Sequence, residues 1–179
     1  GTILWSYYAG MESGTALAGI LAGRINPSGK LAETFPRVYE DTPTGHNGQF
    51  GRDDMVCYEE EIMVGYRHYE KNDILPMFCF GHGLSYTEFA YHDLQVKQDN
   101  DAKDRVSISF DIENVGQIDG REIVQIYVRD EECTVIRPEK ELKAFKSITL
   151  KAGSICRVEI TLDSMAFSFY DEKKHDFCV

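Results

Sequence analysis

The most restrictive feature of this sequence is the strict alternation of apolar and polar residues in "RVSISFDIEN", residues 105–114. Val106, Ile108, Phe110 and Ile112 fall on one face of an extended chain, and serines and carboxylates fall on the other. A period of two residues indicates a strand with one buried face and one face in solvent. We therefore predict a half-buried antiparallel β-strand in this segment.

Three later segments continue this pattern. "EIVQIYVRD" (122–130) turns Val124, Ile126 and Val128 inward, and "ELKAFKSITLKAG" (141–153) reads as a strand closed by a turn. "SICRVEITLD" (154–163) alternates through Cys156, Val158, Ile160 and Leu162, and "AFSFYD" begins a fifth strand. Short alternating strands separated by turns are typical of a β-sandwich. With roughly 75 residues, this sandwich is expected to lack its last strand or two.

The N-terminal segment predicts a different kind of structure. "TILWSYYA" (2–9) is an apolar and aromatic run, as in a strand buried on both faces. "GMESG" follows as a turn with Ser13 as the expected N-cap, and "TALAGILAGRI" then places apolar residues on one helix side. These residues are Ala16, Leu17, Ile20 and Leu21. A strand, a turn and a helix form one α/β unit, and a start inside a buried strand suggests a piece of a longer protein.

Two connecting segments follow this unit. Residues 36–57 are polar and rich in glycine and proline, and we expect a long ordered loop there. Residues 64–89, "VGYRHYEKNDILPMFCFGHGLSYTEF", are dense in aromatic side chains that would bury large areas. We interpret this stretch chiefly as a joint that packs the α/β part onto the sandwich. The predicted domains are therefore residues 1–88, including the loop and joint, and residues 89–179.

Composition excludes several classes of function. Thirty acidic against nineteen basic residues give a net charge of -11, which disfavours nucleic-acid binding. No run of about 18 apolar residues occurs, so no membrane span is expected. The five cysteines are odd in number and lack C-x-x-C spacing, which favours free, mostly buried thiols over a zinc site or a disulfide framework. No cofactor is indicated, while location and oligomeric state, a homo-oligomer included, stay open.

Several long motifs in a fixed order resemble one family. "YYAGMESGTALAGILAGRINPSGKLAETFP", "YEEEIMVGYRHYE", "PMFCFGHGLSYTEF", "NVGQIDGREIVQIYVRD" and "RPEKELKAFKSITLKAG" are similar to the C-terminal portion of glycoside hydrolase family 3, the β-glucosidase family. The resemblance departs from the usual pattern at Ala9, Met11, Ala32, Cys79 and Ala144. It implies an α/β fragment followed by a fibronectin type III-like, immunoglobulin-like sandwich, truncated at both ends.

The resemblance also implies where the chemistry takes place. Family 3 enzymes are retaining, with an aspartate nucleophile in a barrel domain and a glutamate acid/base well upstream of "GMESG". Retention needs two carboxyl groups about 5 to 5.5 Å apart, and no such pair is assigned here, so no catalytic residue is predicted. The implied function is the C-terminal fragment of a β-glucosidase releasing terminal β-linked glucose, inactive alone. An oligosaccharide or β-glucoside substrate would bind through the missing domains; β-xylosidase and N-acetylglucosaminidase parents are alternatives.

Four residues are candidates for substrate binding. Trp5 and Glu12 lie near the turn after the predicted strand, where an aromatic ring and a carboxylate suit a sugar; alternatively, Trp5 is core and Glu12 binds backbone at the helix start. Tyr58 stands beside three glutamates, as a pocket rim or as part of a solvated acidic run. Arg67 has the fork geometry for a carboxylate or for substrate hydroxyls, or it packs in the joint.

Two other classes of function stay open. The chain is alternatively a stand-alone fibronectin type III-like module that binds carbohydrate or protein without activity. It is otherwise a degenerate fragment with no activity. Removal of part of an α/β sheet exposes strand edges and apolar surface, so we expect the isolated chain to be poorly soluble.

Overall fold

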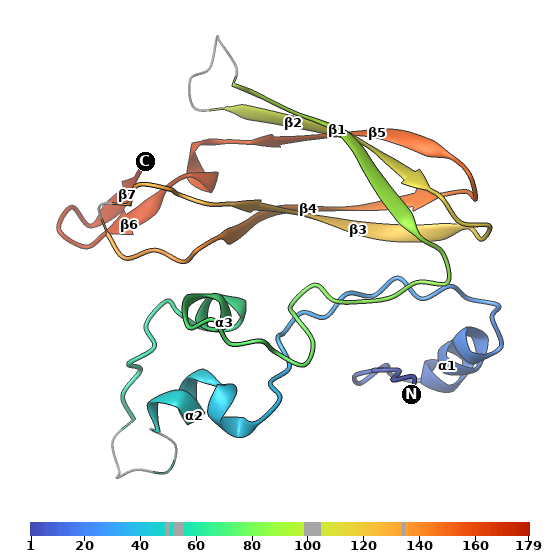
Figure 1. Ribbon diagram of the computed structural model, residues 1–179, viewed down its shortest axis with the longest axis horizontal. Coiled ribbons are helices and arrows are strands. Elements are labelled where there is room, and N and C mark those ends of the chain that lie inside the picture. The colour runs from blue at the N-terminus through green and yellow to red at the C-terminus, as the bar shows by residue number, and fades with distance from the viewer. Residues whose placement is uncertain (49–50, 52–55, 99–104, 134) are drawn as a thin grey trace.

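The computed structural model describes residues 1–48, 51, 56–98, 105–133 and 135–179. It consists mostly of strands with a few short helices (Figure 1). Two layers of strands and one helical turn, η2 (Ser164–Ala166), make up the C-terminal part, and the other helices lie in the N-terminal part, on the side of strands β3 and β4. The two parts are joined where the chain passes from the aromatic segment into β1.

The strands form two main sheets. β1 (Phe89–Gln98), β2 (Val106–Asn114) and β5 (Ile155–Leu162) are antiparallel in the order β1-β2-β5. β3 (Gly120–Val128) pairs with β4 (Glu141–Leu150) in a second antiparallel sheet. The four strand segments predicted from alternation are confirmed, and we call β1–β5 the sandwich.

The core lies between these sheets. Ile112 is fully buried on β2, and the other core residues come from β2, β3, β4 and β5 and from the helical turn at Ala166. They are Ile108, Phe110, Val124, Ile148, Leu150, Val158, Leu162 and Ala166. The predicted inward faces of β2 and β3 are thus confirmed, with Ile126 and Val128 partly buried against the core. Cys156, predicted to face inward, is exposed because it lies near the start of β5, an edge strand.

Two strands were not anticipated. β1 was not predicted from the sequence. It is an edge strand whose last eight residues are exposed on both faces, so the segment has no alternation of apolar and polar residues. A register shift between His92 and Gln95 interrupts its pairing with β2. The predicted fifth strand is confirmed as β6 (Phe169–Asp171), and it pairs with β7 (Asp176–Cys178) in a separate hairpin. This hairpin lies at one end of the sandwich (Figure 1).

The predicted N-terminal strand is wrong. Residues 2–9 form no strand, and Ile3, Trp5 and Tyr8 are exposed rather than buried. A strand buried on both faces needs neighbouring strands and covering helices. Within the ranges that the structure describes, no segment pairs with residues 2–9, so their apolar composition alone does not produce a strand.

Helix α1 (Ser13–Leu21) is confirmed, with a different start. Glu12, not Ser13, occupies the N-cap position, and no side chain caps the helix. Of the predicted apolar side, Ala16, Leu17 and Ile20 are half-buried and Leu21 is exposed, because little of the described chain covers this helix. Gly19 is buried, and a Cβ there would meet the Ile25 side chain at 2.6 Å, so the residue permits a close contact.

Residues 36–57 contain short helices rather than loop alone. η1 (Tyr39–Asp41) precedes α2 (Pro43–Asn47), where the Thr42 hydroxyl accepts the Gly45 N–H at 3.0 Å. Pro43 at the first helical position and a left-handed Gly48 at the end explain this turn of helix. Residues 49–50 and 52–55 of the predicted loop lie outside the described residues.

Two further findings concern the helices and the cysteines. α3 (Tyr66–Lys71) is the third α-helix, and no helix in the described part of the chain is long and apolar enough to cross a membrane. All five cysteines are free, but four are exposed and Cys178 is partly exposed. The expectation of mostly buried thiols is therefore wrong, because these residues lie in loops, on an edge strand and in the terminal hairpin.

Candidate functional site

The aromatic segment, residues 64–89, lies against the sheet of β3 and β4. The Tyr66 hydroxyl accepts the Leu142 N–H at 2.9 Å, and its ring meets the edge of Tyr127 at 5.8 Å between centroids. Arg67 forms an ion pair with Glu141 at 3.1 Å. α3 places these two side chains, so a helix of six residues anchors the N-terminal part at the start of β4.

A second set of contacts lies near the start of β3. Lys30 Nζ is 3.1 Å from a Glu122 carboxylate oxygen and donates to the Gly83 carbonyl at 2.8 Å. Gly83 has no room for a side chain, because a Cβ would meet the carbonyl of Gly29. Gly81, with φ of +80°, approaches the Gln125 side chain in the same way. These glycines let backbone and side chains approach closely.

The end of β2 is tied to the same segment by a buried side chain. Asn114 is fully buried, and its Oδ1 accepts the Thr87 hydroxyl at 2.6 Å. Its Nδ2 donates to the carbonyl of Ile118 at 2.8 Å and to that of Leu150 at 3.3 Å. One amide therefore joins the aromatic segment, β2, the β2–β3 loop and β4.

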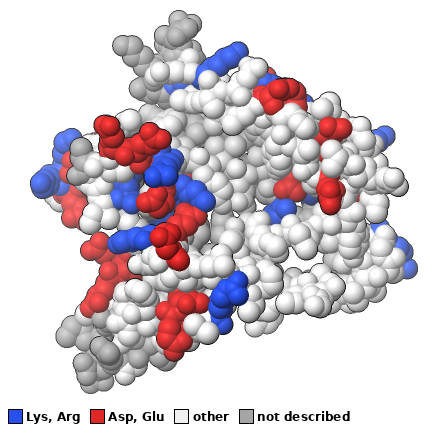
Figure 2. Space-filling model, in the orientation of Figure 1, with Lys and Arg blue, Asp and Glu red and all other residues white. Residues whose placement is uncertain are grey.

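Glu141 is the centre of an ionic cluster. Besides Arg67, its carboxylate pairs with Arg137 at 3.0 Å and Lys143 at 3.3 Å, and Arg137 also pairs with Asp130. Burial alone would raise the pKa of Glu141, but Arg137, Lys143 and Arg67 together hold this pKa below its usual value. Positive and negative side chains are interleaved on this side of the molecule (Figure 2), rather than forming a basic face.

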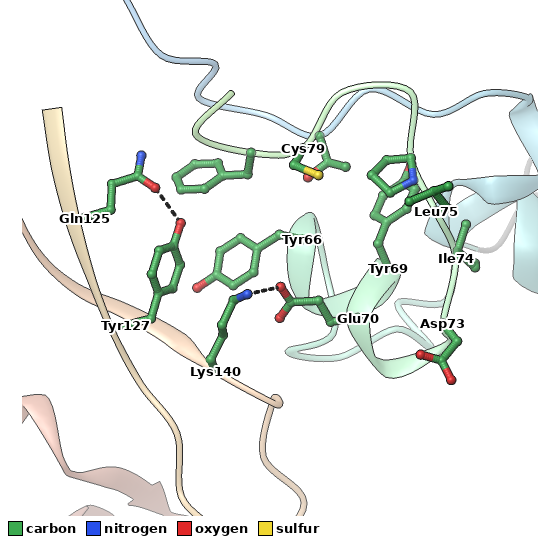
Figure 3. A pocket seen from close by; sticks show the side chains of 13 residues that line it. Tyr66, Tyr69, Glu70, Asp73, Ile74, Leu75, Cys79, Gln125, Tyr127 and Lys140 are labelled. Carbon is green, nitrogen blue, oxygen red and sulfur yellow. Dashed lines mark hydrogen bonds and ion pairs between the residues drawn. The ribbon is translucent and has the colours of Figure 1, made fainter. Parts of the chain in front are cut away.

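A pocket of about 490 Å³ opens between the aromatic segment and the sandwich (Figure 3). α3 and the loop after it form one wall, and the other wall comes from β3 and the residue before β4. The lining residues are Thr34, Tyr66, Tyr69, Glu70, Asp73, Ile74, Leu75, Pro76, Cys79, Phe80, Gln125, Tyr127 and Lys140. Thr34 reaches it because the Phe35 N–H donates to the Phe78 carbonyl at 2.8 Å.

The residues that line the pocket carry both paired polar groups and buried, unpaired ones. Lys140 Nζ lies 2.7 Å from Glu70 Oε1, and the Tyr127 hydroxyl donates to Gln125 Oε1 at 2.7 Å. Burial, with the nearby Tyr66, Glu70 and Cys79, raises the pKa of Tyr127 to about 12, so its hydroxyl stays protonated at neutral pH. Glu70 Oε2 and Thr34 Oγ1 are buried with no hydrogen-bond partner among the described atoms.

The structure does not bring the four candidate binding residues together. Trp5 is about half exposed and meets Tyr7 and Phe35 edge-on, at 5.5 and 5.2 Å. Glu12 is exposed at the start of α1, and Tyr58 is 79% exposed. In the described ranges, no hydrogen bond, ion pair or ring contact joins any two of Trp5, Glu12, Tyr58 and Arg67.

Sequence reasoning did not find the pocket. Its aromatic residues were noticed in the segment 64–89, but their density was interpreted chiefly as packing of a joint. The second wall comes from residues 125–140, which alternation identified only as sandwich strand and loop. A polar residue such as Lys140 at the end of an exposed loop carries no signal in the sequence that distinguishes it from a solvated charge.

Comparison with known proteins identifies both parts of the chain. Residues 1–86 match the model of the glycosyl hydrolase family 3 C-terminal domain, and residues 122–179 match that of the fibronectin type III-like domain. Thermostable beta-glucosidase B of Acetivibrio thermocellus is 46% identical over 179 residues, a match covering 99% of this chain and 24% of the relative. Probable beta-glucosidase K of Emericella nidulans is 44% identical, covering 97% and 20%.

Solved structures agree with these relatives. The beta-glucosidase from Kluyveromyces marxianus in complex with glucose superposes with a TM-score of 0.87 at 37% identity, covering 95% of this chain and 20% of that one. The family 3 beta-glucosidase of Bifidobacterium adolescentis gives 0.86 at 36% identity, covering 92% and 24%. The chain thus spans about a fifth to a quarter of the length of these proteins. In fold and in sequence, the chain belongs to glycoside hydrolase family 3.

Proposed function

We propose that this chain is the C-terminal supporting part of a retaining β-glucosidase that releases terminal β-linked glucose. The observation that carries the proposal is the similarity to beta-glucosidases along nearly the whole chain, at 36–46% identity in the relatives compared above. The nucleophile and the acid/base would lie on polypeptide outside residues 1–179. The substrate would be a β-glucoside or an oligosaccharide with a terminal β-linked glucose.

Within that enzyme, residues 1–88 would hold the sandwich in place. We propose that residues 1–88 are the end of an α/β domain and that the sandwich domain begins at Phe89, because β1 pairs with β2. The aromatic segment supplies the interface through Tyr66, Arg67 and Gly81. The exposed apolar residues 2–9 are then a surface for the neighbouring catalytic domains, since exposed apolar patches of this kind mark interaction sites.

The candidate residues for substrate contact divide into two groups under this proposal. Trp5, Glu12 and Tyr58 are exposed and are available to the rim of a pocket completed by other domains. Arg67 is held by Glu141, which favours a role in the interface over contact with substrate. Replacement of Trp5 by alanine in the full-length enzyme would raise KM if the rim role is correct.

The test compares two proteins. We expect the full-length protein that carries residues 1–179 to hydrolyse an aryl β-glucoside, and proton NMR to detect the β-anomer of glucose first. Purified 1–179 should show no turnover, because the carboxyl pair required for retention lies elsewhere. Measurable hydrolysis by 1–179 alone, or release of the α-anomer first by the full-length enzyme, would contradict the proposal.

A further inference from the structure

His68 is a buried histidine that the proposed function does not use. It lies on α3 with only 3% of its surface exposed. Its ring meets the His46 ring of α2 nearly edge-on, at 5.3 Å between centroids, and its Nε2 is 3.1 Å from the Asp41 carbonyl oxygen of η1. Figure 1 shows α2 next to α3. The His68 side chain therefore joins α3 to residues 39–47, which we call the η1–α2 segment.

The hydrogen bonds of His68 fix its protonation state. A carbonyl oxygen only accepts, so Nε2 carries the proton that it donates to Asp41. Nδ1 lies 3.3 Å from Nδ2 of Asn72. The same Nδ2 donates to the His68 carbonyl at 2.9 Å, so the nitrogen of this amide, and not its oxygen, faces His68. Nδ1 is therefore the acceptor, and the imidazole is neutral.

We propose that His68 is a pH switch, which holds the η1–α2 segment on α3 while its ring is neutral and releases the segment when the ring is protonated. A proton on Nδ1 would face the N–H donor of Asn72. Rotation of the Asn72 amide would instead turn its oxygen toward the His68 carbonyl, so neither arrangement satisfies every group. Separation of the segment from α3 would expose the ring to water, which accepts both protons of an imidazolium.

The surroundings of His68 oppose its protonation. Burial lowers the pKa of His68 below its usual value of 6.5, and the hydrogen bond to the Asp41 carbonyl acts against this effect. The charges of His46 and Lys71 lower the pKa further, while Glu60 raises it. The Asp41 carboxylate accepts two neighbouring backbone N–H groups at 3.2 Å. The titratable groups around the ring are thus Asp41 from η1, His46 from α2, Glu60 from the turn before α3, and Tyr69 and Lys71 from α3.

The sign of the pH dependence follows from this lowered pKa. The open form binds the proton more tightly than the closed form, because its ring is in water. The closed form is therefore fully favoured above pH 6.5 and loses this advantage as the pH falls through the lower pKa of the closed form. At pH 5 the equilibrium constant for opening can rise by at most about thirtyfold, the ratio set by an open ring with a pKa of 6.5.

Hydrogen exchange measures this opening. The amides of Gly45 and His46 donate to the Thr42 hydroxyl and carbonyl within the segment. A helix of five residues is not stable by itself, so these amides should exchange once the segment leaves α3. In the whole protein that carries residues 1–179, we expect protection of residues 39–47, corrected for the intrinsic rate at each pH, to fall severalfold between pH 7.5 and pH 5. Protection of β2 should stay unchanged.

Three variants assign the response to His68. Asn72→Asp places a hydrogen-bond acceptor opposite Nδ1, so a protonated ring is satisfied in the closed form, and most of the pH response should disappear. His68→Gln keeps an N–H donor for the Asp41 carbonyl but cannot titrate, and its response should stay below about twofold. His46→Gln is the matched control, because it removes the exposed neighbouring imidazole, and it should keep most of the response.

Several results would overturn the proposal. These are equal protection of residues 39–47 at both pH values, an equal loss of protection in β2, a full response in Asn72→Asp, or loss of the response in His46→Gln. If His68→Gln fails to fold, the Asn72→Asp and His46→Gln variants still decide between the outcomes. Turnover of a glucoside does not enter the readout, so a failure here leaves the proposed β-glucosidase role standing.

Discussion

Glu141 shows how one side chain links distant parts of the chain. Its carboxylate meets Arg67 from α3, Arg137 from the loop before β4, and Lys143 within β4. Hydrogen bonds to charged groups each contribute about 1.5–3 kcal/mol to stability. The lowered pKa of Glu141 means that the folded state binds its proton more weakly than the unfolded state. Its stabilising effect is therefore present above pH 4.5 and is lost as the pH falls through the folded pKa.

The first prediction concerns removal of this charge. Glu141→Gln should lower the free energy of unfolding by about 1.5–3 kcal/mol at pH 7. The difference from the wild type should begin to shrink below pH 4.5, where the unfolded state takes up the proton, and should disappear once the pH falls below the lowered pKa of folded Glu141. Glu139→Gln is the control, because Glu139 pairs with Arg129 on the exposed surface and should contribute at most about 1 kcal/mol. Urea unfolding at several pH values measures both; equal losses would contradict the argument.

The second prediction concerns Gly81. Its φ of +80° is unfavourable for any residue with a Cβ, and a Cβ there would also displace the Gln125 side chain. Gly81→Ala should therefore cost more than the roughly 1–2 kcal/mol of a left-handed backbone alone. Gly153→Ala is the matched control, with φ of +67° and no atom within 4 Å of the new Cβ. If both variants lose the same free energy of unfolding, close approach to Gln125 has no energetic role.

At the scale of elements, strand β2 is the centre of the sandwich. It lies between β1 and β5, and its inward residues face the β3–β4 sheet. It ends at Asn114, whose amide joins four segments by hydrogen bonds. Because this amide is fully buried, both its donors and its acceptor must be satisfied within the protein.

The third prediction tests this end of β2. Asn114→Asp keeps the shape but removes the N–H donors to the Ile118 and Leu150 carbonyls and buries a carboxyl group. We expect a loss of about 3 kcal/mol in the free energy of unfolding. Gln117→Glu makes the same amide-to-carboxyl change at an exposed position in the loop that follows and should be near neutral. Comparable unfolding curves for the two variants would exclude the proposed role.

The elements also show which predictions sequence patterns support. β2 was predictable because one face is buried and one is exposed, so apolar and polar residues alternate along its sequence. β1 carries no such pattern, since most of it is exposed on both sides. Residues 2–9 have the composition of a buried strand, but a strand forms only beside neighbours. The pocket was not predictable, because residues 34, 66–80 and 125–140 meet only through tertiary packing.

At the scale of the whole molecule, large apolar side chains are exposed in both parts, and several of the most exposed lie in the N-terminal part. Tyr8 and Met11 are fully exposed, and Ile3, Leu21 and Leu84 are at least two-thirds exposed. Soluble monomers rarely leave large contiguous apolar patches uncovered. A polypeptide of these 179 residues alone should therefore self-associate.

The fourth prediction follows from this exposure. The double variant Tyr8→Ser, Met11→Ser should associate less than the wild-type chain, at an unchanged free energy of unfolding, because neither side chain is buried. Sedimentation velocity over a range of concentrations measures the association. A double variant with Ser147→Ala and Thr161→Ala, both at exposed strand positions, is the control and should associate as the wild type does. A wild-type chain that stays monomeric would refute the expectation.

The ion pairs Lys30–Glu122 and Arg67–Glu141 lie near opposite ends of the β3–β4 ladder, in which Gly120 pairs with Leu150 and Val128 with Glu141. One contact between two bodies leaves them free to pivot about that point, whereas two separated contacts restrict the pivot to a single axis. The side-chain bond from Thr87 to Asn114 adds a third point of attachment. The two parts therefore do not rotate freely about the link at Glu88 and Phe89. We expect residues 1–88 and the sandwich to tumble with one common rotational correlation time.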